Sequence, residues 1–156
     1  MTKSNIITLL SIVVLIALAV IAYQFKTAIL SPQGVTRAVM QSGCDLHQSD
    51  CTAVFSDGRK ATLSLTPKNL PLLKPIQIQV QLEGFKAKSM QFNIIGLNMD
   101  MGVNRNTLVS NNQQSFQGKM ILPTCSNQRM EWEAQAVITD HDDKIVIAPF
   151  QFYTDK

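Results

Sequence analysis

The stretch IQIQVQL, residues 76–82, alternates apolar and polar side chains without interruption. Successive side chains of a β-strand point to opposite faces of a sheet. Its four aliphatic residues would therefore share one face, and its three glutamines the other. Period-two alternation of this quality predicts a strand that is buried on one face and solvated on the other.

The same pattern recurs along the chain from about Cys44 to Tyr153. Residues 60–66, 88–95 and 130–136 also alternate, and turn signals such as Asp57–Gly58 come at about ten-residue spacing. No part of this region has a convincing 3.6-residue period. Roughly seven to nine short strands of this kind predict an all-β domain, specifically an immunoglobulin-like antiparallel β-sandwich.

A different pattern occupies the N-terminus, where residues 6–25, IITLLSIVVLIALAVIAYQF, carry no charge. A helix of about 20 residues spans roughly 30 Å, the thickness of the hydrocarbon layer of a membrane. We expect one transmembrane helix that anchors the chain in the lipid bilayer. The alternative is a cleaved signal peptide, because ALA at 17–19 matches a cleavage site.

These patterns predict three parts of the chain. Residues 1–25 form a cytoplasmic tip and the anchor, residues 26–43 a linker interrupted by Pro32 and Gly34, and residues 44–156 the β-sandwich domain. The expected location is a bacterial inner membrane, crossed once, with the C-terminal domain in the periplasm.

Cysteine usage agrees with an exported domain. Cys44 and Cys51 lie close together in the polar segment CDLHQSDC and would form a disulfide in an oxidising compartment. Cys125 is then left as a free thiol, a metal ligand or half of an intermolecular disulfide.

Catalytic signatures are missing from the sequence. It has no Gly-rich phosphate loop, GxSxG or HExxH motif, and His47 and His141 lie in polar stretches that suggest solvated loops. The segment 140–144, DHDDK, suggests a charged hairpin tip. Basic residues are scattered singly and the net charge is only +3, so a nucleic-acid surface is not expected. We predict a protein that is not an enzyme.

One segment offers metal chemistry. Met99 and Met101 are interpreted as the end of a strand that runs into a glycine turn, where residues i and i+2 share a face about 7 Å apart. Soft sulfur ligands select Cu(I), and Cys125 and Met130 could complete a site, with His47 as a further partner. The alternatives are that the methionines fill the core or form a partner-binding surface.

Three motifs, CDLHQSDC, NMDMGVNR and GKMILPTCSNQRMEWEA, resemble those of an uncharacterised proteobacterial family of short, single-pass membrane-anchored proteins. The resemblance rests on C-x6-C, MxMG and LPxC followed by MxW, and covers essentially the whole chain after the anchor. It implies membrane anchorage but no activity. The architecture is also similar to YtkA-like and FixH-like domains, which are linked to cation handling and cytochrome oxidase assembly.

Together these observations predict a non-enzymatic interaction or assembly module of the cell envelope, with another envelope protein as its partner. The alternative function is a copper-binding accessory protein for oxidase assembly or copper handling. No cofactor other than copper is suggested.

Overall fold

The computed structural model describes residues 35–156, which form one compact unit. The predicted anchor at 6–25 lies outside the described residues, as does the first part of the predicted linker. Within residues 35–156 no helix is long and apolar enough to cross a membrane. The described chain contains strands and turns, so the prediction of an all-β domain is confirmed.

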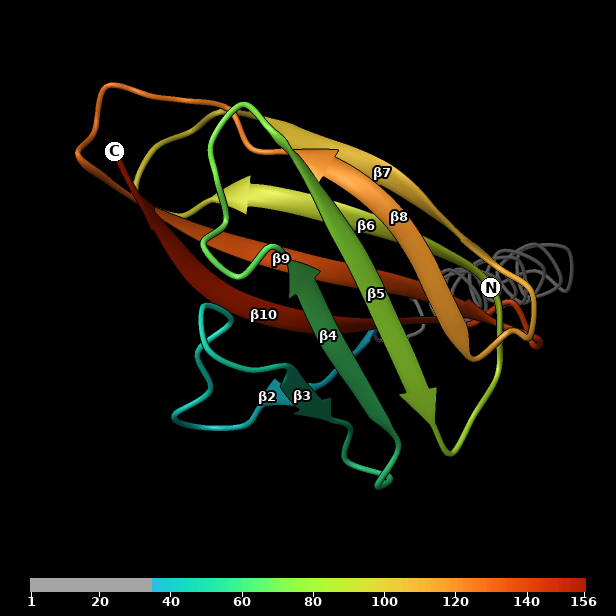
Figure 1. The fold of residues 1–156 in the computed structure, drawn as a ribbon. Coiled ribbons are helices and arrows are strands. Elements are labelled where there is room, and N and C mark those ends of the chain that lie inside the picture. The colour runs from blue at the N-terminus through green and yellow to red at the C-terminus, as the bar shows by residue number, and fades with distance from the viewer. Residues whose placement is uncertain (1–34) are drawn as a thin grey trace, which may run out of the picture. The chain divides into compact units, whose positions relative to one another are not determined.

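Ten strands make up the described region (Figure 1). They are β1 (Thr36–Arg37), β2 (Val39–Met40), β3 (Cys51–Val54), β4 (Lys60–Thr66), β5 (Pro75–Glu83), β6 (Ala87–Gly96), β7 (Val103–Ser110), β8 (Ser115–Ile121), β9 (Arg129–Asp140) and β10 (Ile145–Asp155). Residues 36–40, which the sequence places in the linker, thus belong to the sheet.

All ten strands join in a single sheet, in the order β1-β10-β9-β6-β7-β8-β5-β4-β3-β2. Every pairing is antiparallel except that of β1 with β10. The sheet curls on itself, because β1 and β2 are separated only by Ala38 yet pair with strands at opposite ends of the order. The result is barrel-like.

The single sheet differs from the two separate sheets predicted for a sandwich, and β7 is the reason. Its first part pairs with β6 over Val103–Leu108, and its last two residues, Val109 and Ser110, pair with β8. One strand therefore belongs to both halves of the fold, and hydrogen bonding continues around the bend.

The core lies inside this curled sheet and is built from the alternating faces read in the sequence. In β5 the four aliphatic residues are buried and the three glutamines are exposed. The predicted inward residues of β4, β6 and β9 are likewise buried, Trp132 among them. Trp132 donates its indole Nε1–H to Thr154 Oγ1 at 2.9 Å, which satisfies both buried polar groups.

Candidate functional site

The predicted disulfide between Cys44 and Cys51 is present, with a Cα–Cα distance of 5.6 Å. The loop that it closes is packed firmly, since Leu46 is fully buried. His47 is half-buried: its Nε2 lies 2.8 Å from the backbone oxygen of Tyr153, and its ring lies 4.7 Å from the Tyr153 ring. His47 thus lies in a turn, as predicted, but is only partly solvated, because its ring packs against Tyr153 of β10.

The predictions for His141 and for the segment 140–144 are confirmed. His141 is exposed in the turn between β9 and β10, where its ring lies 3.2 Å from Gln113 Oε1. Asp140 accepts the backbone N–H groups of Asp142 and Lys144, as expected of a charged hairpin tip. A hydrogen bond and ion pair with Lys88 hold the pKa of Asp143, in the same tip, below its ordinary value.

Met99 and Met101 lie in the loop between β6 and β7, so the prediction that both belong to a strand is wrong. Asn98 ends the strand by substituting its side-chain amide for backbone pairing. It donates to Arg129 O at 3.0 Å and accepts from Glu131 N at 3.2 Å. The predicted glycine turn is present, with Gly102 at a φ of +69° and its N–H bonded to Asp100 Oδ1.

Both loop methionines are half-buried and pack against the core, so the interpretation as core filler holds in part. The backbone of Met99 comes close to Gly96, and a methyl group at Gly96 would collide with the Met99 carbonyl oxygen. It would also lie 3.2 Å from Met130 Cε. The absence of a side chain at Gly96 therefore allows the methionine loop to lie close to Met130, at the start of β9.

Cys125 and Met130 both contact Asn127. The Cys125 thiol, which is free and half-buried, faces Asn127 O at 3.9 Å, and Asn127 Nδ2 lies 3.8 Å from Met130 Sδ. Both sulfur residues line one narrow crevice, together with Thr154. The structure thus brings Cys125 and Met130 together and places the Met99 backbone near the Met130 methyl, while His47 is engaged elsewhere. Residues 35–156 hold no cluster of three or more His, Cys, Asp and Glu side chains that could bind a metal ion.

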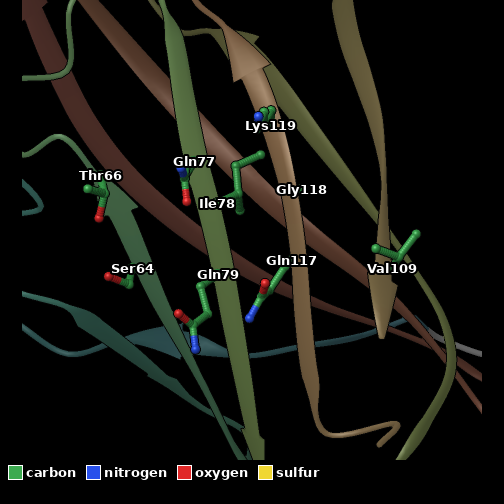
Figure 2. Close-up of a pocket in the computed structure, with 9 residues that line it drawn as sticks. All are labelled: Ser64, Thr66, Gln77, Ile78, Gln79, Val109, Gln117, Gly118 and Lys119. Carbon is green, nitrogen blue, oxygen red and sulfur yellow. The ribbon is translucent and has the colours of Figure 1, made fainter. Parts of the chain in front are cut away.

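A second candidate site lies on the outer face of β4, β5 and β8. It is a trough with a volume of about 360 Å³, shown with its lining residues in Figure 2. Hydroxyl and amide side chains dominate its wall, and Val109 of β7 closes one side. The lining consists of Ser64, Thr66, Gln77, Ile78, Gln79, Val109, Gln117, Gly118 and Lys119. A neighbouring hollow of about 250 Å³ shares Val109 and Gln117 and continues toward the β7–β8 turn.

The trough is neutral apart from one cation. Lys119 is its only charged lining residue, and no carboxylate occurs between Asp100 and Glu131 in the sequence. Within the described part of the chain Lys119 forms no ion pair. The amides of Gln77, Gln79 and Gln117 are exposed, so their donors and acceptors are open to a ligand.

Sequence reasoning placed the glutamines of 76–82 on the solvent face but did not recognise a site. The evenly spaced amides of Gln77, Gln79 and Gln81 were visible in the sequence. The pairing of β5 with β8, which sets Gln79 opposite Gln117, was not visible, because the paired residues are more than 30 positions apart in the chain.

No protein-family model matches this sequence, and no curated protein matches it.

Proposed function

We propose that this protein is a membrane-anchored periplasmic binding module that holds another envelope protein and catalyses no reaction. The observation that carries the proposal is the trough over β4, β5 and β8, a concavity of about 360 Å³ with open polar groups on the outer face of the sheet. The uncharged segment 6–25 supports the anchor, and the Cys44–Cys51 disulfide supports an oxidising compartment.

The chemistry of the trough supports binding rather than catalysis. General acid–base catalysis needs a group that takes up or releases a proton near neutral pH, and nucleophilic catalysis needs a base beside the nucleophile. No histidine lines the trough, and Asp50, the carboxylate that hydrogen-bonds to Ser64, is a weak base because hydrogen bonds from Lys68 and Ser64 hold its pKa below the ordinary value. The hydroxyls and amides can orient a ligand by hydrogen bonds without activating it.

The connectivity supports the finer assignment of an immunoglobulin-like fold. Constant-type immunoglobulin domains order their strands ABED in one sheet and CFG in the other. The orders β4-β5-β8-β7 and β6-β9-β10 follow the same scheme when β4 is taken as strand A. On this assignment β7 corresponds to strand D, and its additional pairing with β6 joins the two halves.

Photo-crosslinking in cells tests the proposed function. A photoreactive amino acid is placed at position 79, position 117 or the control position 142, in the exposed β9–β10 turn, in the full-length chain. We expect one discrete adduct with an envelope protein from positions 79 and 117, and none from position 142. Equal labelling from all three positions, or no adduct from the trough, would contradict the proposal.

A second function, Cu(I) binding, is favoured by one observation: Cys125 and Met130 line the same crevice and meet around Asn127. Thiolate and thioether ligands suit Cu(I). The residues that would hold it are Cys125, Met130, Met99 and Met101, and the loop methionines would have to turn toward the crevice.

Titration of the full-length chain with Cu(I), with the Cys125 thiol reduced and the Cys44–Cys51 disulfide intact, against a competing chelator, tests this second function. Tight one-to-one binding that is lost in Cys125→Ser and in Met99→Leu/Met101→Leu is the expected result. Met120→Leu, which alters a buried methionine of β8, is the matched control. Binding that survives these ligand changes, or no binding at all, would exclude the copper function.

A further inference from the structure

The polar side chains on the outer face of β4, β5 and β8 form three regular rows across the sheet, and the second and third rows line the trough. Strand register places Thr62, Gln81 and Ser115 in one row, Ser64, Gln79 and Gln117 in the next, and Thr66, Gln77 and Lys119 in the third. Members of a row come from three neighbouring strands. Because each row is two residues from the next along the strands, the rows repeat about every 6.6–6.8 Å.

This spacing equals the two-residue repeat of an extended polypeptide, about 6.6–6.8 Å. A segment in β conformation that runs along β8 would present the same backbone groups to each successive row. Primary amides both donate and accept hydrogen bonds, so Gln77, Gln79 and Gln117 can bind carbonyl oxygens and N–H groups alike. The neighbouring hollow beside Ser110 and Asn112 reaches Ser115 and lengthens the path beyond the first row, at the end away from Lys119.

The positive charge of Lys119 indicates which side chains a bound segment would carry. Lys119 stands at one end of this path without an ionic partner among the described residues, and no carboxylate lines either hollow. Asp50, which hydrogen-bonds to Ser64, is already paired with Lys68. The lining residues of a second copy docking by the same face would therefore offer Lys119 no unpaired acid. A partner segment with an acidic side chain would pair with it.

We propose that the trough binds an extended, acidic segment of the partner protein, with its backbone read by the glutamine rows and a carboxylate paired with Lys119. This inference rests on the proposed binding function and adds the chemistry and the conformation of the partner.

The probe for this test is a labelled peptide of alternating glutamate and threonine, compared with one of alternating lysine and threonine. Binding to the detergent-solubilised full-length chain is followed by fluorescence anisotropy. We expect the acidic peptide to bind in preference to the basic one. Lys119→Glu should weaken acidic-peptide binding by about tenfold, because it replaces a surface attraction with a repulsion, each worth a few-fold in affinity.

One control variant and one charge-exchange measurement make the result specific. Lys144→Glu makes the same charge change at the exposed β9–β10 turn and should leave binding unchanged. The Lys119→Glu protein should in turn prefer the basic peptide, an exchange that a merely structural role of Lys119 would not produce. Hydrogen exchange should show protection by the acidic peptide in residues 75–83 and 115–121.

The outcomes separate the two proposals. Equal binding of both peptides, or insensitivity to Lys119→Glu, would overturn the inference, as would an adduct at position 79 with a glycan or with a second copy of this chain. If position 79 still crosslinks to an envelope protein, the binding function stands without the acidic segment. If position 79 gives no adduct, the binding function itself fails.

Discussion

The hydrogen bond between Trp132 and Thr154 allows a quantitative test of the fold beside the crevice that Cys125 and Met130 line. Trp132 is 2% exposed and Thr154 4% exposed, so neither group can turn to water. Thr154→Val keeps the shape of the side chain but replaces the hydroxyl with a methyl group, which leaves the indole N–H without a partner. An unsatisfied buried donor costs about 1–3 kcal/mol.

For a domain of this size, each kcal/mol lowers Tm by about 4 °C, so Thr154→Val should unfold about 4–12 °C below the wild type. Trp132 is the only tryptophan in the chain, so its fluorescence reports the transition directly. Thr154→Ser keeps the acceptor and loses one buried methyl group, at a cost of about 1 kcal/mol. A valine variant as stable as the wild type, or a serine variant less stable than the valine one, would refute this reasoning.

Three further predictions concern other parts of the fold. Reduction of the Cys44–Cys51 disulfide, whose loop is short, should lower the free energy of unfolding by about 2.5 kcal/mol in denaturant titrations, and an unchanged midpoint would count against it. Gly96→Ala should displace the Met99 loop and cost about 1–3 kcal/mol, with faster amide exchange at Leu97, whose N–H bonds to Glu131 O at 2.8 Å. Burial raises the pKa of Glu133, but hydrogen bonds from Gln135 and Arg37 outweigh it and hold the pKa below the ordinary 4.5. The Glu133–Arg37 pair therefore stabilises the fold at pH values above the unfolded-state pKa of Glu133, and this stability is lost as the pH falls through the lower pKa of the folded state. Arg37→Gln removes the pair and should make the fall in Tm between about pH 5 and pH 3 less steep. An identical decline in both proteins would show that the pair contributes nothing.

The strands could be predicted because the alternation of apolar and polar residues within each run indicates which face of the strand is buried. Residues 76–82 and 130–136 needed no partner strand to be recognised. The disulfide was predictable for a similar reason, since its cysteines lie close together in sequence. Met130 and Cys125 are also neighbours in the chain, and their proximity followed from that.

Long-range pairing decided the features that were missed. Asn98 ends β6 only because the backbone of β9 lies beside it, so the Met99–Met101 loop could not be distinguished from a continuing strand. The barrel-like closure depends on β7 pairing first with β6 and then with β8. The rows of the trough depend likewise on the register of three strands, which no single stretch of sequence contains.

We propose that the outer face of β4, β5 and β8 binds a protein partner. The most direct test is co-isolation of the crosslinked partner with two matched single variants of the full-length chain. Gln117→Ala removes an amide from the trough, whereas Gln91→Ala removes an exposed amide from β6, outside it. We predict that Gln117→Ala reduces recovery of the partner several-fold, while Gln91→Ala leaves recovery at the wild-type level. Equal recovery with both variants would show that the trough does not bind the partner.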